Sequence, residues 1–153
     1  MDPKASVILC GYNQKEYLVC AIESVLGQTC RDFELILIDN GSTDGSSKLL
    51  MAYEGRPNIR IFAFPENAPL TKRYNDALRM AEGEFICFLN ADDYLLPRKL
   101  ERQIEAFKAL GADYAMVYSP VKFINVLNGK EWIGETIKSS GSILRDLFDD
   151  FFT

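Results

Sequence analysis

The sequence predicts an α/β domain in which a mostly parallel sheet carries helices on both faces. Short apolar runs of strand length alternate along the chain with longer stretches whose apolar residues recur at helical spacing. This alternation is typical of repeated strand–helix–strand units. The chain has 153 residues, of which 48% are hydrophobic and 25% are charged. That length and composition suit a globular domain, so we expect a single domain spanning residues 1–153.

The apolar runs give the expected strands. They are residues 6–10, 33–38, 59–64, 84–89 and 114–118. A hairpin is expected from Val121 to Ile137, because the Asn128-Gly129 dipeptide favours the tight turn that joins two antiparallel strands.

Amphipathic stretches between the strands give the expected helices. The first helix follows Asn13, which can cap it together with Glu16 in a capping box. The second begins near Thr43-Asp44 and ends near Tyr53, and the last covers residues 141–151.

The third and fourth expected helices are defined by their apolar faces. The third ends at Gly83, and its expected buried residues are Tyr74, Ala77, Leu78 and Ala81. The expected buried residues of the fourth are Leu100, Ile104, Phe107 and Leu110. Pro97 suits the first turn of this helix, and Gly111 fits the position just after its end.

Charge and composition exclude several classes of protein. With 17 basic and 22 acidic residues the net charge is −5, so no nucleic-acid partner is expected, because phosphate backbones attract basic faces. The absence of histidine excludes histidine-based catalysis and histidine metal ligands from this chain. No apolar run approaches the ~20 residues of a membrane span. With no secretory signal and no Cys-x-x-Cys pair, a reduced, cytoplasmic setting is expected.

Polar residues follow each of the first four strands. The clusters are Tyr12-Asn13, Asp39 to Asp44, Glu66 to Arg73 and Asn90 to Asp93. In parallel sheets the carboxyl ends of the strands share an edge, and ligands bind there. We therefore expect a site at this edge. The chain has no Gly-x-Gly-x-x-Gly after its first strand and no Walker loop, which argues against dinucleotide oxidoreductases and P-loop enzymes.

Two of these clusters contain carboxylates, and each of these carboxylates has two possible interpretations. Asp92 and Asp93 could hold Mg²⁺ or Mn²⁺ together with substrate phosphates, or one of them could cap the next helix. Asp39 could accept a hydrogen bond from a ligand N–H, or it could belong to an ordinary turn.

The residues of the other two clusters also allow two interpretations each. Tyr12 could stack on a flat ring or pack against its neighbours. Lys72 and Arg73 could meet a diphosphate, which needs positive charge and many donors, or they could form a solvated helix face.

At these positions the sequence resembles a family 2 glycosyltransferase with a GT-A fold. The matching segments are Ser6 to Asn13, Ile22 to Thr29, Phe33 to Ser46, Asn75 to Leu78, Ala81 to Ile86, and Leu89 to Asp93 with Pro97 and Leu100. Each segment is modest alone, but their shared order and spacing are specific.

The resemblance implies transfer of a sugar from a nucleotide-sugar donor, most often a UDP-sugar, to an unknown saccharide, lipid or protein acceptor. By analogy Tyr12 stacks on the base and Asp39 accepts from the base N–H. Asp92, with Asp93, holds the Mn²⁺ or Mg²⁺ ion that bridges the diphosphate. The full donor-binding set implied is Tyr12, Asn13, Asp39, Lys72, Arg73, Asn75, Asn90 and Asp92.

This chain departs from the family pattern at two site positions. Asn90 replaces the first Asp of the Asp-x-Asp motif, which removes one negative charge. Tyr74 stands directly before Asn75, where the family usually has an Arg, so Lys72 or Arg73 would have to substitute.

Family members typically continue well beyond the length of this chain. Their second half supplies the acceptor platform and the general base, so the base is expected beyond Thr153. Asp149 and Asp150 are more naturally a solvated helix face. A nucleotide-binding or regulatory module without transferase activity is the alternative. A receiver domain fits less well, because the first strand ends in Gly11-Tyr12-Asn13 rather than in an acidic pair.

Overall fold

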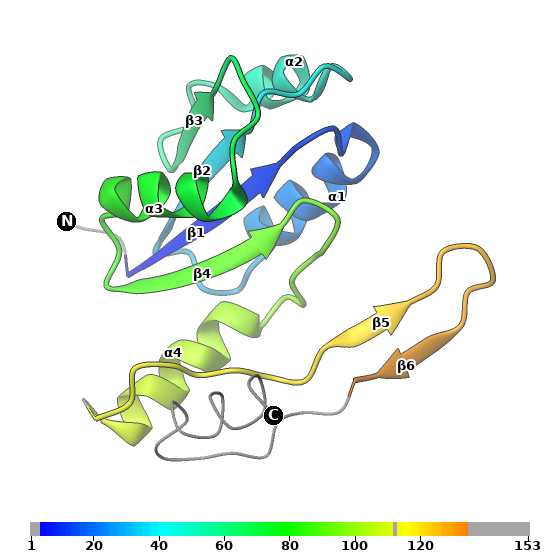
Figure 1. Cartoon of the computed structure of the whole chain (residues 1–153). Helices are drawn as coiled ribbons and strands as arrows, with labels where there is room; N and C mark the ends of the chain where they lie inside the picture. Colours follow the sequence, from blue (N-terminus) through cyan, green and yellow to red (C-terminus); the bar gives the residue numbers. More distant parts are fainter. Residues whose placement is uncertain (1–3, 112, 135–153) are drawn as a thin grey trace, which may run out of the picture. The chain divides into compact units, whose positions relative to one another are not determined.

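The computed structural model describes residues 4–111 and 113–134, which belong to two compact units, Met1–Ile104 and Glu105–Thr153. The first unit contains a four-stranded parallel sheet with strand order β3-β2-β1-β4 (Figure 1). Its strands are β1 (Ala5–Gly11), β2 (Phe33–Asp39), β3 (Ile59–Ala63) and β4 (Phe85–Asn90). The expected first four strands are therefore confirmed to within about one residue at each end.

The register of the sheet aligns the carboxyl ends of its strands. Gly11 pairs with Asp39, Asp39 pairs with Ala63, and Cys10 pairs with Asn90. The chain leaves all four strands at the same edge, so the residues that follow them are brought together as expected.

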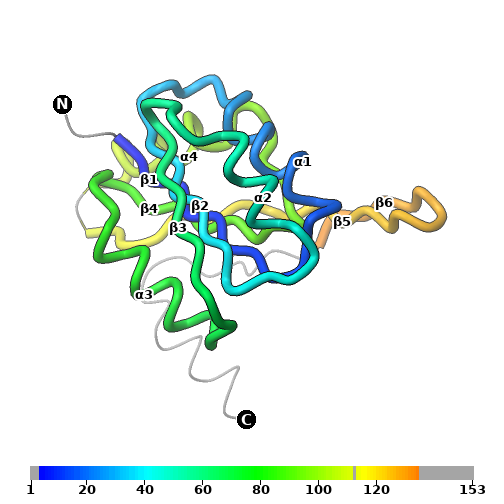
Figure 2. Tube along the Cα trace, turned by 90° about the horizontal axis from the view of Figure 1, so that it is seen from above, coloured from blue at the N-terminus to red at the C-terminus, as the bar shows by residue number. Residues whose placement is uncertain are grey.

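Helices cover both faces of this sheet. One face carries α1 (Lys15–Leu26), the short α2 (Ser46–Leu50) with the 3₁₀ turn η1 (Met51–Tyr53), and the first turns of α4 (Lys99–Leu110). The other face carries α3 (Leu70–Met80) (Figures 1 and 2). None of the helices in residues 4–111 and 113–134 has the length and hydropathy that a transmembrane segment requires.

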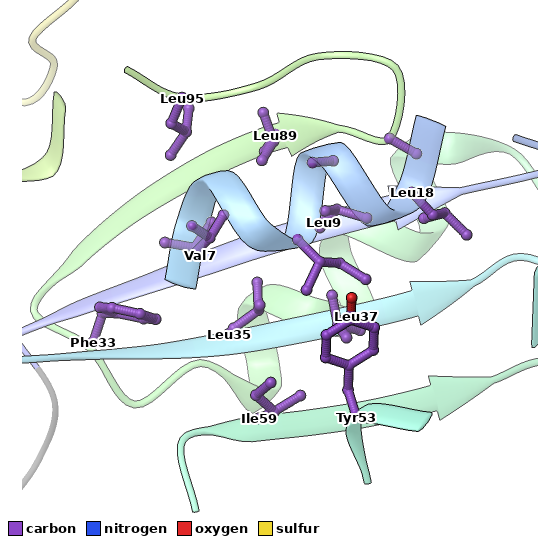
Figure 3. Close-up of a cluster of buried hydrophobic side chains, with 14 of the residues drawn as sticks. Val7, Leu9, Leu18, Phe33, Leu35, Leu37, Tyr53, Ile59, Leu89 and Leu95 are labelled. Carbon is purple, nitrogen blue, oxygen red and sulfur yellow. The ribbon is translucent and has the colours of Figure 1, made fainter. Parts of the chain in front are cut away.

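The strands β1 and β2 are buried on both faces, and alternate residues divide between two apolar clusters. The side chains of Val7, Leu9, Leu35 and Leu37 point toward α1 and join Leu18 and Tyr53 (Figure 3). Ile8, Cys10, Ile36 and Ile38 pack under Ala77 of α3. Continuous apolar runs of this kind are typical of parallel strands covered on both sides.

The first two helices begin later than the sequence predicts. Asn13 is not a helix cap, because it has φ = 53° and α1 begins only at Lys15. The second helix begins at Ser46, since Asp44 Oδ1 accepts hydrogen bonds from the backbone N–H of Ser46 (2.9 Å) and from its hydroxyl (2.6 Å).

The buried face of α3 also differs from the prediction. Arg73 and Ala77 are its buried residues, and the predicted Tyr74 and Ala81 pack partly buried against the same apolar cluster, whereas Leu78 is 42% exposed. Residues four apart share a helix face, so burial of Arg73 and Ala77 turns Leu78 about 100° away from the sheet.

The fourth helix follows its predicted pattern in the first turns. Leu100 and Ile104 are buried, but Leu110 is 44% exposed. Gly111 has φ = 84°, and its N–H donates to the carbonyl of Phe107 (3.0 Å). This is the expected helix-ending role of glycine.

The described part of the second unit contains one hairpin. Its strands are β5 (Lys122–Ile124) and β6 (Glu131–Ile133), and Gly129 has φ = 69° in the connecting turn. The hairpin prediction is thus confirmed as far as residue 134. The strand predicted at 114–118 was wrong: this segment is irregular, because strand propensity gives a strand only where a ladder forms. The helix predicted at 141–151, with Asp149 and Asp150, lies outside the described residues.

Candidate functional site

Asn13 joins the loop after β1 to the loop after β2. Its backbone N–H donates to Ser42 Oγ (3.0 Å), and its Oδ1 accepts from the N–H of Thr43 (2.8 Å). Asparagine tolerates the left-handed conformation that this contact needs. Next to it the Tyr12 side chain is 42% exposed, so its ring is free to stack on a ligand.

Asp39 is held at the end of β2 with one carboxylate oxygen engaged. The residue is only 3% exposed, and Oδ1 accepts from the N–H of Ser42 (3.3 Å). Within residues 4–111 and 113–134, no buried side-chain oxygen lacks a hydrogen-bond partner. None of the hydrogen bonds found in this part of the chain involves Oδ2 of Asp39, so this oxygen keeps the capacity to accept from a ligand.

Asn40 is a site residue that the sequence reasoning missed. It is 4% exposed, and its Nδ2 donates to Asn67 Oδ1 and to the carbonyl of Ala68 (both 2.8 Å). Its Oδ1 accepts from the N–H of Ala68 (3.0 Å) and from Arg73 Nε (2.7 Å). The amide therefore ties the loop after β3 to the end of β2. An Asn that precedes a Gly is typical of a turn, so nothing in the sequence indicated that Asn40 would hold the loop after β3.

Arg73 points into the protein. Besides Asn40, its guanidinium donates to the carbonyl of Glu66 (2.8 Å) and lies 3.6 Å from the centroid of the Phe64 ring. Asp76 lies 3.6 Å away as an ion-pair partner. The loop after β3 is thereby fixed by Arg73, whereas Lys72, its neighbour on α3, is exposed.

A close backbone approach holds the same loop against the end of β2. Gly41 has φ = 78°, and a Cβ built there would lie 2.5 Å from the carbonyl carbon of Glu66. Only glycine fits both the conformation and the space. Asn75, the remaining predicted residue of α3, is exposed, and its backbone carbonyl accepts from Arg79 (3.3 Å).

Asn90 links Tyr74 to Asp93 after β4. The Tyr74 hydroxyl donates to Asn90 Oδ1 (3.1 Å), and Asn90 Nδ2 donates to Asp93 Oδ2 (3.0 Å). Burial, with smaller contributions from Cys10, Asp93 and Asp92, raises the pKa of Tyr74 above its ordinary value. The hydroxyl therefore stays protonated and able to donate at neutral pH.

Asp92 and Asp93 are exposed and do not cap the next helix, since α4 begins only at Lys99. In the described part of the chain neither forms an ion pair. No group of three or more His, Cys, Asp or Glu side chains suited to a metal ion occurs among those same residues. The two carboxylates fit Mg²⁺ or Mn²⁺ in oxygen chemistry, but such an ion needs further ligands, which phosphates supply.

The segment after Asp93 is anchored to the end of α1. Gln28 is fully buried; its Nε2 donates to the carbonyl of Leu96 (2.8 Å), and its Oε1 accepts from the N–H of Leu100 (3.0 Å). Ser24 Oγ accepts from the N–H of Leu95 (3.0 Å). Both residues lie within the segment that carries the family resemblance, yet their contact with this loop could not be read from spacing.

A shallow groove of about 390 Å³ lies beside Asn13 rather than at Asp92. It is lined by Asn13, Lys15, Glu16, Asp44 and Leu49. Hydrogen bonds from Ser46 and from the N–H of Lys15 hold the pKa of Asp44 below its ordinary value. Asp44 is therefore committed to holding the starts of α1 and α2.

Comparison with known proteins finds one family and several relatives that this chain resembles. The profile of the family described as "Glycosyl transferase family 2" matches residues 6–146. The chain is 36% identical over 104 residues to the putative teichuronic acid biosynthesis glycosyltransferase TuaG of Bacillus subtilis (strain 168), covering 67% of this chain and 41% of that protein. It is 32% identical over 136 residues to chondroitin synthase of Escherichia coli, covering 85% of this chain and 20% of that protein.

Solved structures share the fold. S. aureus TarS 1–349 in complex with UDP matches with a TM-score of 0.62 at 30% identity, covering 67% of this chain and 31% of that chain. The complex of the same protein with UDP-GlcNAc matches with a TM-score of 0.61 at 31% identity, covering 67% and 30%. The Pyrobaculum calidifontis mannosyltransferase PcManGT, solved with GDP-Man and Mn²⁺, matches with a TM-score of 0.62 at 23% identity, covering 69% and 32%. This last likeness is one of fold alone.

The chain spans less than half the length of each of these proteins. The parallel sheet with helices on both faces is the GT-A arrangement that the resemblance implied. The profile match runs through all four parallel strands and well beyond them. The chain belongs to glycosyl transferase family 2.

Proposed function

We propose that this chain is the donor-binding part of a glycosyltransferase that uses a nucleotide-sugar, with UDP as the nucleotide. The observation that carries the proposal is a set of carboxylates at one sheet edge: the buried Asp39 at the end of β2, and the exposed Asp92 and Asp93 after β4. Ligands of open parallel sheets bind at this edge. TarS, 30–31% identical to this chain, was solved with UDP and with UDP-GlcNAc, which supports the choice of nucleotide.

The base of the donor binds over the ends of β1 and β2 in this proposal. Tyr12 stacks on the uracil ring, and Oδ2 of Asp39 accepts from the ring N–H. A neutral donor facing a carboxylate makes a charge-assisted hydrogen bond, which is stronger than a neutral one. Asn13 holds the neighbouring loop in place through its contacts with Ser42 and Thr43.

The ribose and diphosphate bind toward the start of α3 and the end of β4. Lys72, which is exposed, provides positive charge for the diphosphate, and Asn75 provides amide hydrogen-bonding groups. Asn90 bonds a ribose hydroxyl. Arg73 contributes by fixing the loop after β3, because its guanidinium is buried against Asn40 and Phe64.

Asp92 and Asp93 would hold Mn²⁺ or Mg²⁺. Oxygen ligands suit both ions, and the shortage of further protein ligands in the described residues is met by the phosphates of the donor. When bound, the ion supplies positive charge that stabilises the departing diphosphate.

The reaction proposed is transfer with inversion. An acceptor hydroxyl gives its proton to a general base and attacks the anomeric carbon on the face opposite the diphosphate, the bond from that carbon to the diphosphate oxygen breaks, and UDP leaves. Polysaccharide biosynthesis is the proposed setting, since relatives include a putative teichuronic acid biosynthesis enzyme and chondroitin synthase. The four free thiols favour a reducing, cytoplasmic environment.

Calorimetric titration of the 153-residue chain with UDP, GDP and ADP, each with and without Mn²⁺, tests the proposal. We expect UDP to bind most tightly and only weakly without the metal. Asp92→Asn should weaken Mn²⁺-dependent UDP binding at least about tenfold, because a charge-assisted contact is lost.

Glu54→Gln is the matched control, because Glu54 is an exposed carboxylate in the segment that leads to the amino end of β3, whereas the site lies at the carboxyl ends of the strands. It should leave UDP binding unchanged. Equal affinity for the three nucleotides, or an Asp92→Asn variant that binds as the wild type does, would contradict the proposal. Tight UDP binding without sugar transfer to any acceptor would instead favour the nucleotide-binding module.

A further inference from the structure

Tyr74 and Asn90, two uncharged residues at the edge of the sheet that carries the site, lie in direct contact. Tyr74 is on α3, and Asn90 is the last residue of β4. They are 16 residues apart, and the Tyr74 hydroxyl donates to Asn90 Oδ1 at 3.1 Å. These two uncharged side chains form a neutral hydrogen-bonded pair.

The fold holds this pair in place from both elements. Alternation along β4 puts Phe88 and Asn90 on the face that α3 covers. The Tyr74 ring packs against Phe88, with ring centroids 4.6 Å apart and planes inclined by 53°. The ring cannot leave without losing this contact, so its hydroxyl is directed at Asn90.

Asn90 passes this constraint on to Asp93. With its Oδ1 engaged by Tyr74, the amide presents Nδ2 to Asp93 Oδ2 at 3.0 Å. The backbone N–H of Asp93 also donates to the carbonyl of Asn90 (3.1 Å). The hydrogen bond from Tyr74 therefore sets the orientation of the Asn90 amide, and this orientation directs Nδ2 toward Asp93.

The neutral pair also changes the charge at the metal-binding end of the site. A carboxylate at position 90 would stand next to Asp92 and Asp93 and repel both. An amide there adds no charge and gives Asp93 a donor instead. Asp93 thus keeps one oxygen occupied within the protein and has the other available.

We propose that Tyr74 is a positioning residue that acts through Asn90, and that Asn90, besides its contact with the ribose, fixes the Asp93 carboxylate for the divalent ion of the bound donor. Tyr74 touches neither ion nor nucleotide and acts only through Asn90. This inference rests on the proposed function, because it concerns the same metal and nucleotide.

A double-mutant cycle tests it, with Mn²⁺-dependent UDP binding of the 153-residue chain measured by calorimetry. Tyr74→Phe should raise the Kd for UDP in Mn²⁺ about three- to tenfold, because the Asp93 carboxylate is then held in the binding orientation for only part of the time. It should leave the weak metal-free binding unchanged. In an Asn90→Ala background the same change should have no further effect, because Tyr74 then has nothing to act through.

Tyr53→Phe is the matched control. Its hydroxyl donates to Glu23 Oε1 at 3.0 Å, in the cluster on the opposite face of the sheet. It therefore also loses one tyrosine hydrogen bond, but UDP binding should not change. Additive effects of Tyr74→Phe and Asn90→Ala, or an equal loss with and without Mn²⁺, would overturn the inference.

A second readout separates this inference from the proposed function. The side-chain NH₂ resonances of Asn90, assigned by their loss in Asn90→Ala, should shift in Tyr74→Phe without any ligand present. Unshifted resonances overturn the positioning pair even where UDP binds. A wild-type chain that binds no UDP in Mn²⁺ overturns the proposed function, and with it the role given to the pair.

Discussion

The two ends of the parallel sheet use polar residues in opposite ways. At the amino end, Glu34 is 5% exposed and its carboxylate accepts from three donors. These are the Ser6 hydroxyl (2.5 Å), the N–H of Glu82 (2.7 Å) and Arg60 (3.1 Å). The Ser6 oxygen in turn accepts from the N–H of Gly83 (2.8 Å). This network is closed, with every group satisfied inside the protein.

At the carboxyl end of the sheet, the carboxylates have oxygens that can still accept hydrogen bonds or bind a cation. Asp39 uses one oxygen on Ser42, and Asp92, which is exposed, has no ion-pair partner in the described residues. A buried carboxylate surrounded by donors stabilises the fold, whereas an exposed one beside another carboxylate is useful only when a cation or a ligand arrives. The difference separates residues that hold the sheet together from residues that bind.

The largest expected effect comes from opening the closed network. Glu34→Ala should lower the free energy of unfolding by about 3 kcal/mol, because it leaves the Ser6 hydroxyl and the N–H of Glu82 without this acceptor and removes one partner of Arg60, which still donates to the Met80 carbonyl. That loss corresponds to a fall in melting temperature of roughly 6–12 °C for a chain of this size. Urea unfolding measures it. UDP binding at a temperature where the variant is folded should stay unchanged, and a tenfold loss of affinity would contradict the separation of the two ends.

Gln28→Ala should have the next largest effect, and it should lower both the stability of the fold and the affinity for UDP. Its amide is fully buried and holds Leu96 and Leu100, so removal should cost about 2 kcal/mol of stability. The same contacts anchor the segment after Asp93, so Mn²⁺-dependent UDP binding should weaken as well. Gln28→Glu keeps an acceptor for Leu100 but turns a buried carboxylate oxygen toward the carbonyls of Ser24 and Leu96, so it should not recover the stability. A destabilised variant with wild-type affinity would show that the loop is positioned without Gln28.

Much of the fold could be predicted because parallel strands carry a strong signal. Strands buried on both faces appear as continuous apolar runs, and the runs at 6–10 and 33–38 proved to be β1 and β2. Once those strands are parallel, the polar residues that follow them must share an edge. The placement of Tyr12 and Asp39 at one edge therefore followed from the sequence.

The contacts that shape the site could not be predicted, because they depend on which atoms meet across loops. Arg73 reads as a surface cation, yet its guanidinium is buried against Asn40 and Phe64. Asn13 reads as a helix cap, yet its amide binds the N–H of Thr43 in another loop. In both cases residue type indicated hydrogen bonding, and only the fold determined the partner.

A smaller effect is expected from pH at the closed network. Burial would raise the pKa of Glu34, but hydrogen bonds from Ser6, Glu82 and Arg60 outweigh it, so the pKa lies below its ordinary value. A lowered pKa means that the unfolded chain takes up the proton first. This contribution to stability is therefore present above the unfolded pKa of about 4.3 and is lost as pH falls through the folded value.

Urea unfolding of the wild type and of Glu34→Gln between pH 7 and pH 3 measures this contribution. Part of the acid-induced loss of stability should disappear in the variant, which cannot ionise at this position. Parallel stability curves for the two proteins would show that Glu34 does not contribute. Glu54→Gln controls for the general effect of removing an acidic group from the chain.

The smallest expected effect on stability belongs to Asp92→Asn, and its smallness sharpens the contrast between the two ends. Asp92 is exposed, so its loss should change the free energy of unfolding by less than about 0.5 kcal/mol. Because the substitution removes the repulsion between Asp92 and Asp93, we expect the free energy of unfolding to rise slightly.

In Mn²⁺ with UDP at 100 times Kd the wild type should gain about 2.7 kcal/mol of stability. The variant should gain far less under the same conditions, because weaker binding of the ligand gives less stabilisation. A variant stabilised by the ligand as much as the wild type would place the metal elsewhere and remove the functional distinction between the two ends of the sheet.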